Sequence, residues 1–238
     1  MYIENKERGK RMKPTVSDEK EALRIMRVLL SFDFEEAITY KKYDDGYTDL
    51  KFEEWRTAHC SILDSLNIRV ERGASKVCIL TPNEDWVIKV NIDRSAKRFN
   101  SGINYCKTEC DNYQYAIESG LDKYFAAMYF CGFVDGIAVY LQERARLDEC
   151  SFESSMYRYI SSCYPKDEYP DEDEREKYIE SAIFGCEVAD YVTAFLGEDM
   201  DCLIDFLESY GINDLHYGNW GFMHDGRIVM IDYSGFFD

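Results

Sequence analysis

Hydrophobic residues recur at helical spacing in the first quarter of the chain and again in its second half. Apolar positions three to four residues apart are typical of an amphipathic helix with one buried face. Before residue 67 this spacing predicts helices over 17–30, 33–41 and 49–66. In the second half it predicts helices over 151–163, 175–196 and 200–210. Both ends of the chain are therefore expected to be mainly helical.

Between these helical regions the hydrophobic period changes to two, which is typical of strands. The alternation begins at Ile68, and turn residues separate the runs that follow. It predicts five strands over 68–72, 77–80, 86–90, 125–133 and 137–141, and a helix over 101–119. Near the end, Asp225-Gly226 is a hairpin turn that folds 220–223 back on 227–231. The pattern as a whole predicts an α+β protein.

These changes of period predict three parts along the chain. They are a helical extension over 1–66, a strand-rich part over 67–143 and a mainly helical part over 144–238. With 46% hydrophobic and 15% aromatic residues, the 238-residue chain has enough apolar side chains for a substantial core. We expect the helical extension to brace the sheet, with a substrate-binding cap as the alternative.

Cysteine usage and hydropathy indicate a reduced, intracellular setting. Nine cysteines are spread singly with no C-x-x-C pair, which favours free thiols and no structural zinc. The chain has no run of 18 apolar residues, and its N-terminal segment lacks the apolar stretch of a secretory signal. We therefore expect a cytoplasmic protein, with a secreted effector acting in a host cytosol as the alternative.

The net charge of −18 argues against broad nucleic-acid binding, because such binding depends on Lys and Arg side chains that neutralise phosphates. The basic residues between positions 6 and 13 form only a short tail. An acidic run over 165–174 is expected to be a solvated loop, with binding of a basic partner as the alternative. We expect neither nucleic acid nor a membrane as a partner.

One set of polar residues near the end of the chain carries the candidate chemistry. Asn219 follows Asp214 by five residues, and Asp232 follows thirteen residues later, at the end of the predicted hairpin. The hairpin brings Asn219 and Asp232 to the same end, close enough to share a cation. Phosphoryl transfer needs one carboxylate beside the attacking hydroxyl, and an amide and a second carboxylate that hold Mg²⁺. Taken singly, each of these residues is more often a turn cap or a surface carboxylate.

This segment resembles the catalytic loop and metal-binding Asp of the protein-kinase-like superfamily, in the D-x-x-x-x-N form of protein kinases and aminoglycoside phosphotransferases. The resemblance covers roughly residues 68–238. It implies a two-lobed fold, with a five-stranded antiparallel sheet and a helix in the small lobe and a reduced, mainly helical large lobe. It also implies ATP and Mg²⁺ as cofactors, Asp214 as the catalytic residue, and Asn219 and Asp232 as metal ligands.

Upstream residues resemble the phosphate-binding pair of the same family. Lys89 interrupts the apolar strand 86–90, and a buried ammonium needs an anionic partner. The resemblance implies that Glu109, 20 residues later in the predicted helix, pairs with Lys89 and orients it on the α- and β-phosphates. Glu118 is the alternative partner, but it lies near the helix C-terminus, where the helix dipole disfavours a carboxylate.

Two further segments resemble the backbone contacts that kinases make with a nucleotide. The glycine-rich loop of the family is reduced here to four residues, whose backbone is expected to face phosphate: Gly73, Ala74, Ser75 and Lys76. The segment after the last predicted strand resembles the linker between the lobes, which implies adenine contacts from the Glu143 carbonyl and the Ala145 N–H. His216, inside the catalytic loop, is expected to brace that loop.

The chain departs from protein kinases around its metal motif. That motif reads Asp-Tyr-Ser-Gly rather than Asp-Phe-Gly, Asn213 stands where an Arg often precedes the catalytic Asp, and six residues follow Asp232. These departures predict no regulation by activation-loop phosphorylation and no ordinary platform for a peptide substrate. The chain thus resembles the compact kinase-like proteins of bacteria, phages and secreted effectors.

The expected activity is transfer of the γ-phosphate of ATP, with Mg²⁺, to a hydroxyl of a protein Ser or Thr or of a small molecule. Three alternatives stay open. The first is a pseudokinase that binds nucleotide without turnover, and the second is a kinase fold that transfers AMP. The third is a structural or interaction protein built on the acidic helices, which would bind no nucleotide.

Overall fold

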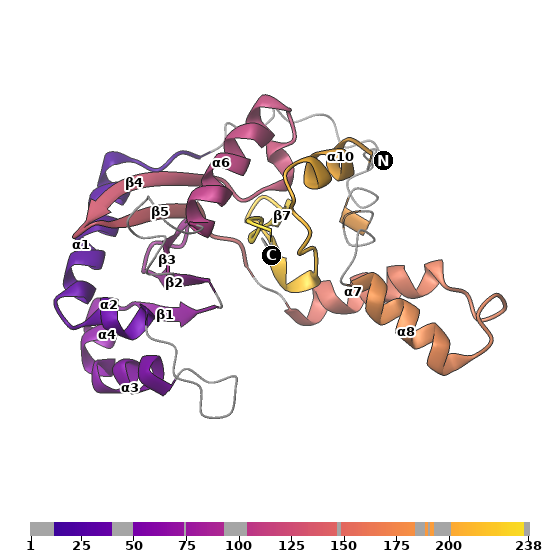
Figure 1. Ribbon diagram of the computed structural model, residues 1–238, viewed down its shortest axis with the longest axis horizontal. Coiled ribbons are helices and arrows are strands. Elements are labelled where there is room, and N and C mark those ends of the chain that lie inside the picture. Colours follow the sequence, from indigo (N-terminus) through magenta and orange to yellow (C-terminus); the bar gives the residue numbers. More distant parts are fainter. Residues whose placement is uncertain are drawn as a thin grey trace.

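The computed structural model shows an α+β protein in which helices cover both faces of an antiparallel sheet (Figure 1). It describes residues 12–39, 50–73, 75–92, 104–146, 149–183, 189, 191–192 and 201–235. The predicted basic tail apart from Met12 and Lys13, Ala74 of the predicted phosphate loop and most of 184–196 lie outside the described residues.

All five predicted strands are present in one sheet. Its order is β1-β2-β3-β5-β4, and every neighbouring pair is antiparallel. The strands are β1 Arg69–Arg72, β2 Lys76–Leu80, β3 Trp86–Asn91, β4 Met128–Val134 and β5 Ile137–Glu143. Asp135 and Gly136 have φ of 50° and 83°. Two positive φ angles are what a two-residue type I′ hairpin turn requires, so this turn joins β4 directly to β5.

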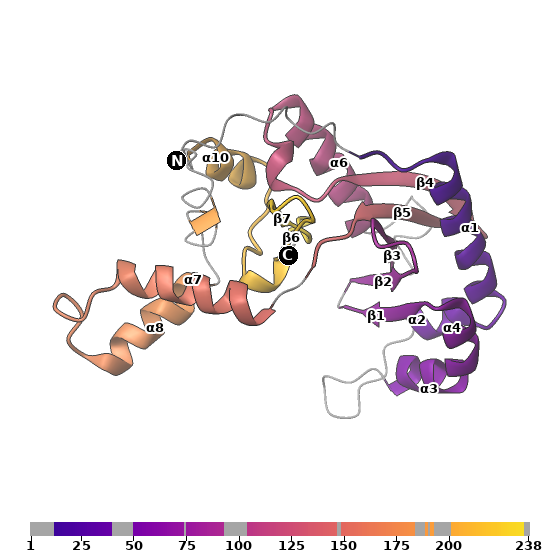
Figure 2. The ribbon, with the colours of Figure 1, turned by 180° about the vertical axis from the view of Figure 1, so that it is seen from behind.

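The sheet separates two hydrophobic cores, because successive residues of a strand face opposite sides. One face packs against four N-terminal helices: α1 Val16–Leu30, α2 Phe34–Thr39, α3 Leu50–Ala58 and α4 Cys60–Leu66. The other face packs against α6 (Tyr105–Glu118) and against the C-terminal half of the chain. Seen from either side, α1 to α4 lie at one end of the molecule and α7 and α8 at the other (Figure 2).

The first helix begins at a capping box. The Thr15 hydroxyl oxygen accepts the Asp18 N–H at 3.2 Å, and the Asp18 carboxylate accepts the Thr15 N–H at 2.7 Å. This reciprocal pair satisfies two backbone donors that a helix N-terminus leaves open. Thr15 is therefore the cap, and the helix starts one residue before the predicted Ser17.

The predicted helix over 49–66 is wrong in one respect, because it is broken at His59 into α3 and α4. The backbone of His59 leaves the helical region, with φ of −112° and ψ of 14°. Its Nδ1 lies 2.8 Å from the carbonyl oxygen of Trp55. The same carbonyl accepts the His59 N–H at 3.1 Å, so the imidazole is its second partner at the point where α3 ends.

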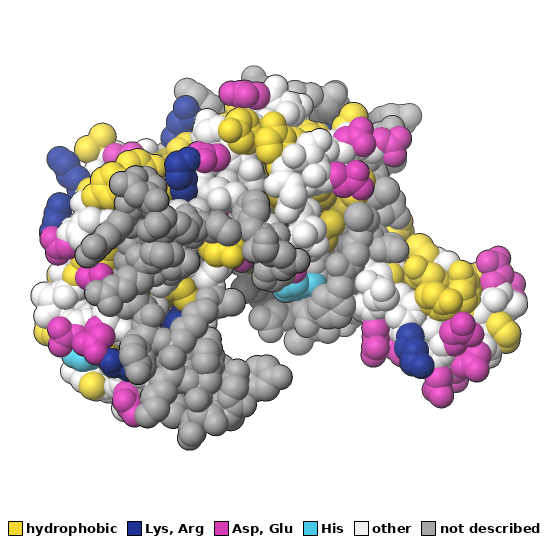
Figure 3. All heavy atoms as spheres, in the orientation of Figure 1, with side chains coloured by type: hydrophobic (Ala, Val, Ile, Leu, Met, Phe, Trp, Pro, Cys, Tyr) yellow, Lys and Arg dark blue, Asp and Glu magenta, His cyan; other side chains and the backbone are white. Residues whose placement is uncertain are grey.

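The C-terminal half is helical until its final hairpin. Its elements are α7 Glu149–Cys163, α8 Glu172–Ile183, α10 Asp201–Ser209, η2 Tyr217–Asn219, β6 Trp220–Phe222 and β7 Ile228–Met230. The α7–α8 pair projects from the rest of the molecule and is rich in Asp and Glu (Figures 1 and 3). The predicted loop over 165–174 is too long, because α8 already begins at Glu172. The carboxylate of Asp171 accepts the Glu174 N–H at 3.0 Å, which caps the helix there.

β4 starts at Met128, three residues later than predicted, because the residues before it pair with the C-terminal hairpin. Phe125 forms an isolated bridge with Met230, and the Ala126 N–H donates to the Met230 carbonyl at 2.9 Å. Through these contacts β7 is joined to the sheet half of the molecule. The end of the chain is therefore held beside α6 and the sheet.

Among the helices of the described ranges, none is long and apolar enough to cross a bilayer. Seven cysteines within those ranges are free thiols: Cys60, Cys78, Cys106, Cys110, Cys131, Cys163 and Cys202.

Candidate active site

Strand register places two lysines on one face of the sheet. Cys78 pairs with Lys89 across β2 and β3, and Lys76 pairs with Asn91. Residues two apart on a strand face the same side, and cross-strand partners share a face. Lys76 and Lys89 are therefore diagonal neighbours on the face that meets α6. Both residues are buried, with only 6% and 4% of their surface exposed.

Helix α6 brings a carboxylate to these lysines. The Asn104 side chain caps the helix by accepting the Lys107 N–H at 2.9 Å, and Asn91 of β3 accepts the Tyr105 N–H at 3.0 Å. With its first turn fixed to β3, α6 places Glu109 fully inside the protein. The α6 helix thus holds an acidic side chain in the one place where two buried ammonium groups need it.

The predicted pair of Lys89 and Glu109 is present. The Lys89 Nζ lies 3.1 Å from Glu109 Oε2 and 3.4 Å from Oε1, and it donates to the Ile231 carbonyl at 2.7 Å. Glu118, the alternative partner, is exposed at the end of the same helix. Lys89 therefore links the sheet both to α6 and to the residue just before Asp232.

The prediction that Lys76 belongs to the turn is wrong, because Lys76 is the first residue of β2. Its side chain enters this cluster. Its ammonium donates to Glu109 Oε1 at 2.8 Å and to Ser234 Oγ at 3.0 Å, and it forms a short ion pair with Asp232 Oδ1. The strand begins one residue earlier than its hydrophobic pattern indicates. As a result, the side chain of Lys76 points inward from the sheet.

Residues next to Asp232 fix its segment to α6 and to the residues that follow the short helix η1 (Asp122–Tyr124). The Tyr233 N–H donates to Glu109 Oε1 at 3.2 Å, and Asn112 donates from Nδ2 to the Tyr233 carbonyl at 2.9 Å. The buried Tyr233 hydroxyl donates to the Ala126 carbonyl at 2.7 Å. Each bond satisfies a buried polar group, so the segment has one well-defined position relative to Glu109.

Burial shifts the pKa of each group in this cluster towards its neutral form, and the neighbouring charges act against that shift. Burial lowers the pKa of Lys76 and Lys89, but the carboxylates, Glu109 foremost, outweigh it and raise both pKa values. Burial likewise raises the pKa of Asp232, yet the ammonium groups of Lys89 and Lys76 lower it to about 2. Burial raises the pKa of Glu109, and the same two ammonium groups oppose that rise. Each ammonium of the cluster therefore lies beside a carboxylate that favours its charged form.

The predicted catalytic loop is closed by side chains of its own. Asn219 donates from Nδ2 to the Asp214 carbonyl at 2.9 Å, and the Asn219 carbonyl accepts the Ile231 N–H at 2.7 Å. The loop is thereby joined to the strand end that leads into Asp232, as the hairpin predicts. The carboxylate of Asp214 remains partly exposed, at 25% of its side-chain surface, and is open to a second molecule.

His216 braces this loop, as expected. Its Nδ1 accepts the Gly218 N–H at 3.1 Å, and its Nε2 lies 3.4 Å from Asp214 Oδ1. An imidazole that accepts at Nδ1 carries its proton at Nε2, on the side of Asp214. A Cβ at position 218 would come within 2.9 Å of the ring, so glycine is needed for this close approach.

A close contact between Gly211 and Gly235 also fixes the Asp214 loop. Gly235 has φ of 71°, and a Cβ at this position would lie 2.1 Å from the Gly211 carbonyl oxygen. Gly211 itself has φ of 64° and ends α10. The residues that enter the Asp214 loop and those that follow Asp232 therefore touch backbone to backbone.

The two segments predicted to contact the nucleotide through their backbone differ in how open they are. The Gly73 N–H donates to the Lys76 carbonyl at 2.8 Å, and a Cβ at Gly73 would meet that oxygen at an ordinary 3.5 Å. The Ser75 carbonyl accepts the Ile92 N–H at 3.0 Å. The turn is thus closed by its own hydrogen bonds, and its geometry does not require glycine at position 73.

The linker residues are held by the sheet and by β6. The buried Glu143 side chain accepts the Ala127 N–H at 3.0 Å, and the Glu143 N–H donates to the Ala127 carbonyl at 2.8 Å. Ala145 lies against β6 so closely that a Cβ on Gly221 would come within 2.7 Å of the Ala145 Cβ. Within the described part of the chain, the Ala145 N–H makes no backbone hydrogen bond, which leaves it available as a donor.

The donor set fits a magnesium ion held jointly with phosphates. No three His, Cys, Asp or Glu side chains of the described ranges converge on a metal position. Magnesium in nucleotide sites is commonly held by one or two side chains, with phosphate oxygens and water completing its shell. Asn219 and Asp232 lie at the same end of one hairpin and supply such a pair, since Asn219 uses only its Nδ2 for the loop.

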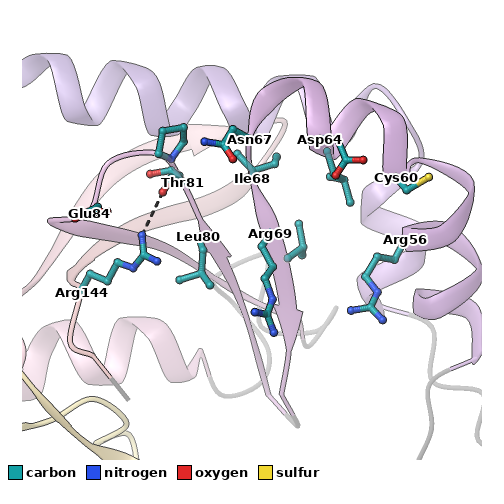
Figure 4. A pocket seen from close by; sticks show the side chains of 13 residues that line it. Arg56, Cys60, Asp64, Asn67, Ile68, Arg69, Leu80, Thr81, Glu84 and Arg144 are labelled. Carbon is teal, nitrogen blue, oxygen red and sulfur yellow. Dashed lines mark hydrogen bonds between the residues drawn. The ribbon is translucent and has the colours of Figure 1, made fainter. Parts of the chain in front are cut away.

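A separate pocket of about 670 Å³ lies at the edge strand β1, next to α3 and α4. Arg56, Arg69 and Arg144 extend into it from three different elements (Figure 4). Arg144 also donates to the Thr81 carbonyl at 3.2 Å. Asp64 and Glu84 line the same pocket, so its charge is mixed. It contains none of the residues predicted for catalysis or nucleotide binding.

Sequence reasoning missed the side chains of Lys76, Ser234, Asn112 and Tyr233. Only Lys76 carried a usable signal, because a turn centred on 73–75 places Lys76 and Lys89 on one sheet face. Which face Lys76 takes depends on where β2 begins, and the hydrophobic run alone starts at Val77. The other three act through contacts between distant segments, which no local pattern records.

Comparisons of the chain with protein-family models, with curated proteins and with solved structures found no match.

Proposed function

We propose that the protein is an ATP- and Mg²⁺-dependent phosphotransferase with a two-lobed, kinase-like fold. One observation carries the proposal: the buried Lys89–Glu109 pair lies directly beside the segment that bears Asp232. A buried ion pair adds little to stability compared with apolar packing, so its presence points to a role in binding or chemistry. The hydrogen bond from the Ile231 N–H to the Asn219 carbonyl supports an acceptor site next to that pair, because Asn219 belongs to the Asp214 loop.

Each residue has a role that its surroundings support. Lys89 neutralises phosphate charge, and Glu109 holds its ammonium in place. Asp214 is partly exposed and orients the acceptor hydroxyl and takes its proton, while His216 and Asn219 fix the loop. Asn219 and Asp232 hold the metal ion. When bound, ATP with Mg²⁺ supplies the transferable phosphoryl group and a cation that neutralises its charge.

Transfer of label from ATP tests this function. The purified chain with γ-labelled ATP, Mg²⁺ and a cell lysate should label an acceptor, and Asp214→Asn should reduce the rate by about 10²- to 10⁴-fold because it removes the base. The melting temperature without ligand should stay unchanged, since the Asp214 carboxylate is partly exposed. Label from α-labelled ATP in place of γ-labelled ATP would show AMP transfer. Mass spectrometry of the labelled products would identify the acceptor.

The second candidate is a nucleotide-binding module without turnover. It is favoured by the ion pair between Lys76 and Asp232 Oδ1, because that oxygen is occupied before any metal arrives. In this case ATP raises the melting temperature, as any ligand specific for the folded state does, but no label is transferred. If ATP with Mg²⁺ leaves the melting temperature unchanged, both candidates are wrong.

A further inference from the structure

Lys76 is a buried cation that the proposed chemistry leaves without a role. Its ammonium has three N–H donors and three partners: Glu109 Oε1, Asp232 Oδ1 and Ser234 Oγ. Ser234 Oγ also lies 3.2 Å from Asp232 Oδ1. All three donors of Lys76 have partners within the protein, and one of these partners is Asp232, the proposed metal ligand.

We propose that the ammonium of Lys76 takes the place of a second divalent ion, so that the nucleotide site holds a single Mg²⁺. This inference rests on the proposed function. Protein kinases use two Mg²⁺ ions held by the metal-binding Asp and the loop Asn. Here one carboxylate oxygen of that Asp is already bound to a cation that belongs to the chain.

The two oxygens of Asp232 differ in their surroundings. Oδ1 accepts from Lys76 and Ser234, whereas no hydrogen bond from the described residues reaches Oδ2. The side chain is 37% exposed, so the carboxylate reaches solvent although Lys76 does not. One oxygen is therefore turned to the protein interior and the other to the position where a metal and phosphates arrive.

Displacement of Lys76 by a second ion is unfavourable for two reasons. A divalent ion at Oδ1 would lie beside an ammonium that is only 6% exposed, and two like charges in a poorly solvated place repel strongly. Movement of the ammonium would leave Glu109 with only one lysine and remove the partner of Asp232, which is costly for buried charges.

Counting bound Mn²⁺ by electron paramagnetic resonance tests this inference, because the method separates free from bound ions. The whole chain is mixed with an equimolar non-hydrolysable ATP analogue at concentrations well above the dissociation constant, and Mn²⁺ is titrated. We expect one tightly bound ion per wild-type chain and two for Lys76→Met, which frees Oδ1. Two ions in the wild type, or one ion in Lys76→Met, would overturn the inference.

Two control variants separate contact from charge. Lys107→Met also removes one positive charge, but Lys107 is half exposed and pairs with Asp111 rather than Asp232, so this variant should still bind one ion. Lys76→Arg keeps a cation at Oδ1 and should also bind one. If Lys76→Met fails to fold, Lys76→Gln replaces it, and spin–spin broadening between paired Mn²⁺ ions in the wild type decides independently. A wild-type chain whose melting temperature does not respond to the analogue would refute the proposed function itself, whereas two ions refute only the inference.

Discussion

Ion pairs of similar length occur in two regions of this protein with opposite surroundings. Lys89 and Glu109 meet at 3.1 Å inside the protein, where their side chains are 6% and 0% exposed. Arg24 and Glu21 meet at 2.7 Å on α1, where both side chains are about half exposed, at 51% and 52%. The shorter pair is the weaker one in its effect on stability, because water screens exposed charges and competes for them.

The difference shows that burial, rather than distance, decides which charged residues matter here. On the surface, removal of one partner leaves the other in water at little cost. In the cluster, removal of one partner leaves a charge that water does not reach. Variants of the two regions should therefore span the full range from severe to negligible effects.

The largest effect is expected for Glu109→Ala, because Glu109 is the common partner of two buried lysines. It should lower the free energy of unfolding by about 3–5 kcal/mol, the usual cost when a buried pair loses one member. Urea denaturation measures the change. Glu118→Ala is the matched control on the same helix and, being exposed, should stay within about 0.5 kcal/mol. Equal effects of the two variants would contradict the comparison.

Nucleotide binding should depend on the buried Lys89 far more than on an exposed lysine. Lys89→Met removes a charged hydrogen bond to phosphate, so it should weaken ATP binding by about tenfold to a hundredfold. Isothermal titration calorimetry in the presence of Mg²⁺ measures the affinity. Lys107→Met, which removes a half-exposed lysine of α6, provides the reference and should bind ATP like the wild type. A normal affinity of Lys89→Met would exclude the assigned role.

Stability at acid pH should report on Asp232. Its pKa falls from 3.8 to about 2 in the folded protein, so the folded state binds this proton less readily than the unfolded chain. The stabilisation is complete above pH 3.8 and is lost as pH falls towards 2. Because this carboxylate is partly exposed, we expect about 1 kcal/mol after solvent screening is discounted. Unfolding between pH 5 and 2.5 should be less pH-dependent in Asp232→Asn than in the wild type. Identical slopes would contradict the prediction.

The smallest effect is expected for Arg24→Ala on α1. Its pair with Glu21 is one helical turn apart and solvent-exposed, so the loss should be about 0.3–0.5 kcal/mol and should vanish at high salt. Thermal unfolding at two salt concentrations measures both the loss of stability and its dependence on salt. A loss comparable to that of Glu109→Ala would mean that exposure does not govern these ion pairs.

The sequence predicted the parts of the fold that follow from local patterns. The five strands and the Asp225-Gly226 hairpin come from alternation and turn residues, which act over a few positions. The Lys89–Glu109 pair was also predicted, because a buried ammonium requires an anionic partner and the resemblance to kinases implied Glu109 as that partner. Roles in catalysis and nucleotide binding stay predictions.

What the sequence did not predict arises from contacts between distant segments. The break of the helix at His59 leaves no signal in the hydrophobic spacing, and the start of β4 depends on pairing with β7. The inward direction of the Lys76 side chain depends on the register of β2 against β3, and a one-residue shift of that register would reverse it. Such choices are made by tertiary packing and leave no local pattern.

The contact between Gly211 and Gly235 sets the distance between the Asp214 loop and the segment that carries Asp232. A Cβ at position 235 would lie 2.1 Å from the Gly211 carbonyl oxygen, so any larger residue at this position would push the two backbones apart. It would spread the Asp214 and Asp232 segments apart while every ionisable group stays unchanged. Substitution of Gly235 is therefore a way to alter the spacing of these two carboxylates without changing the charge of the protein.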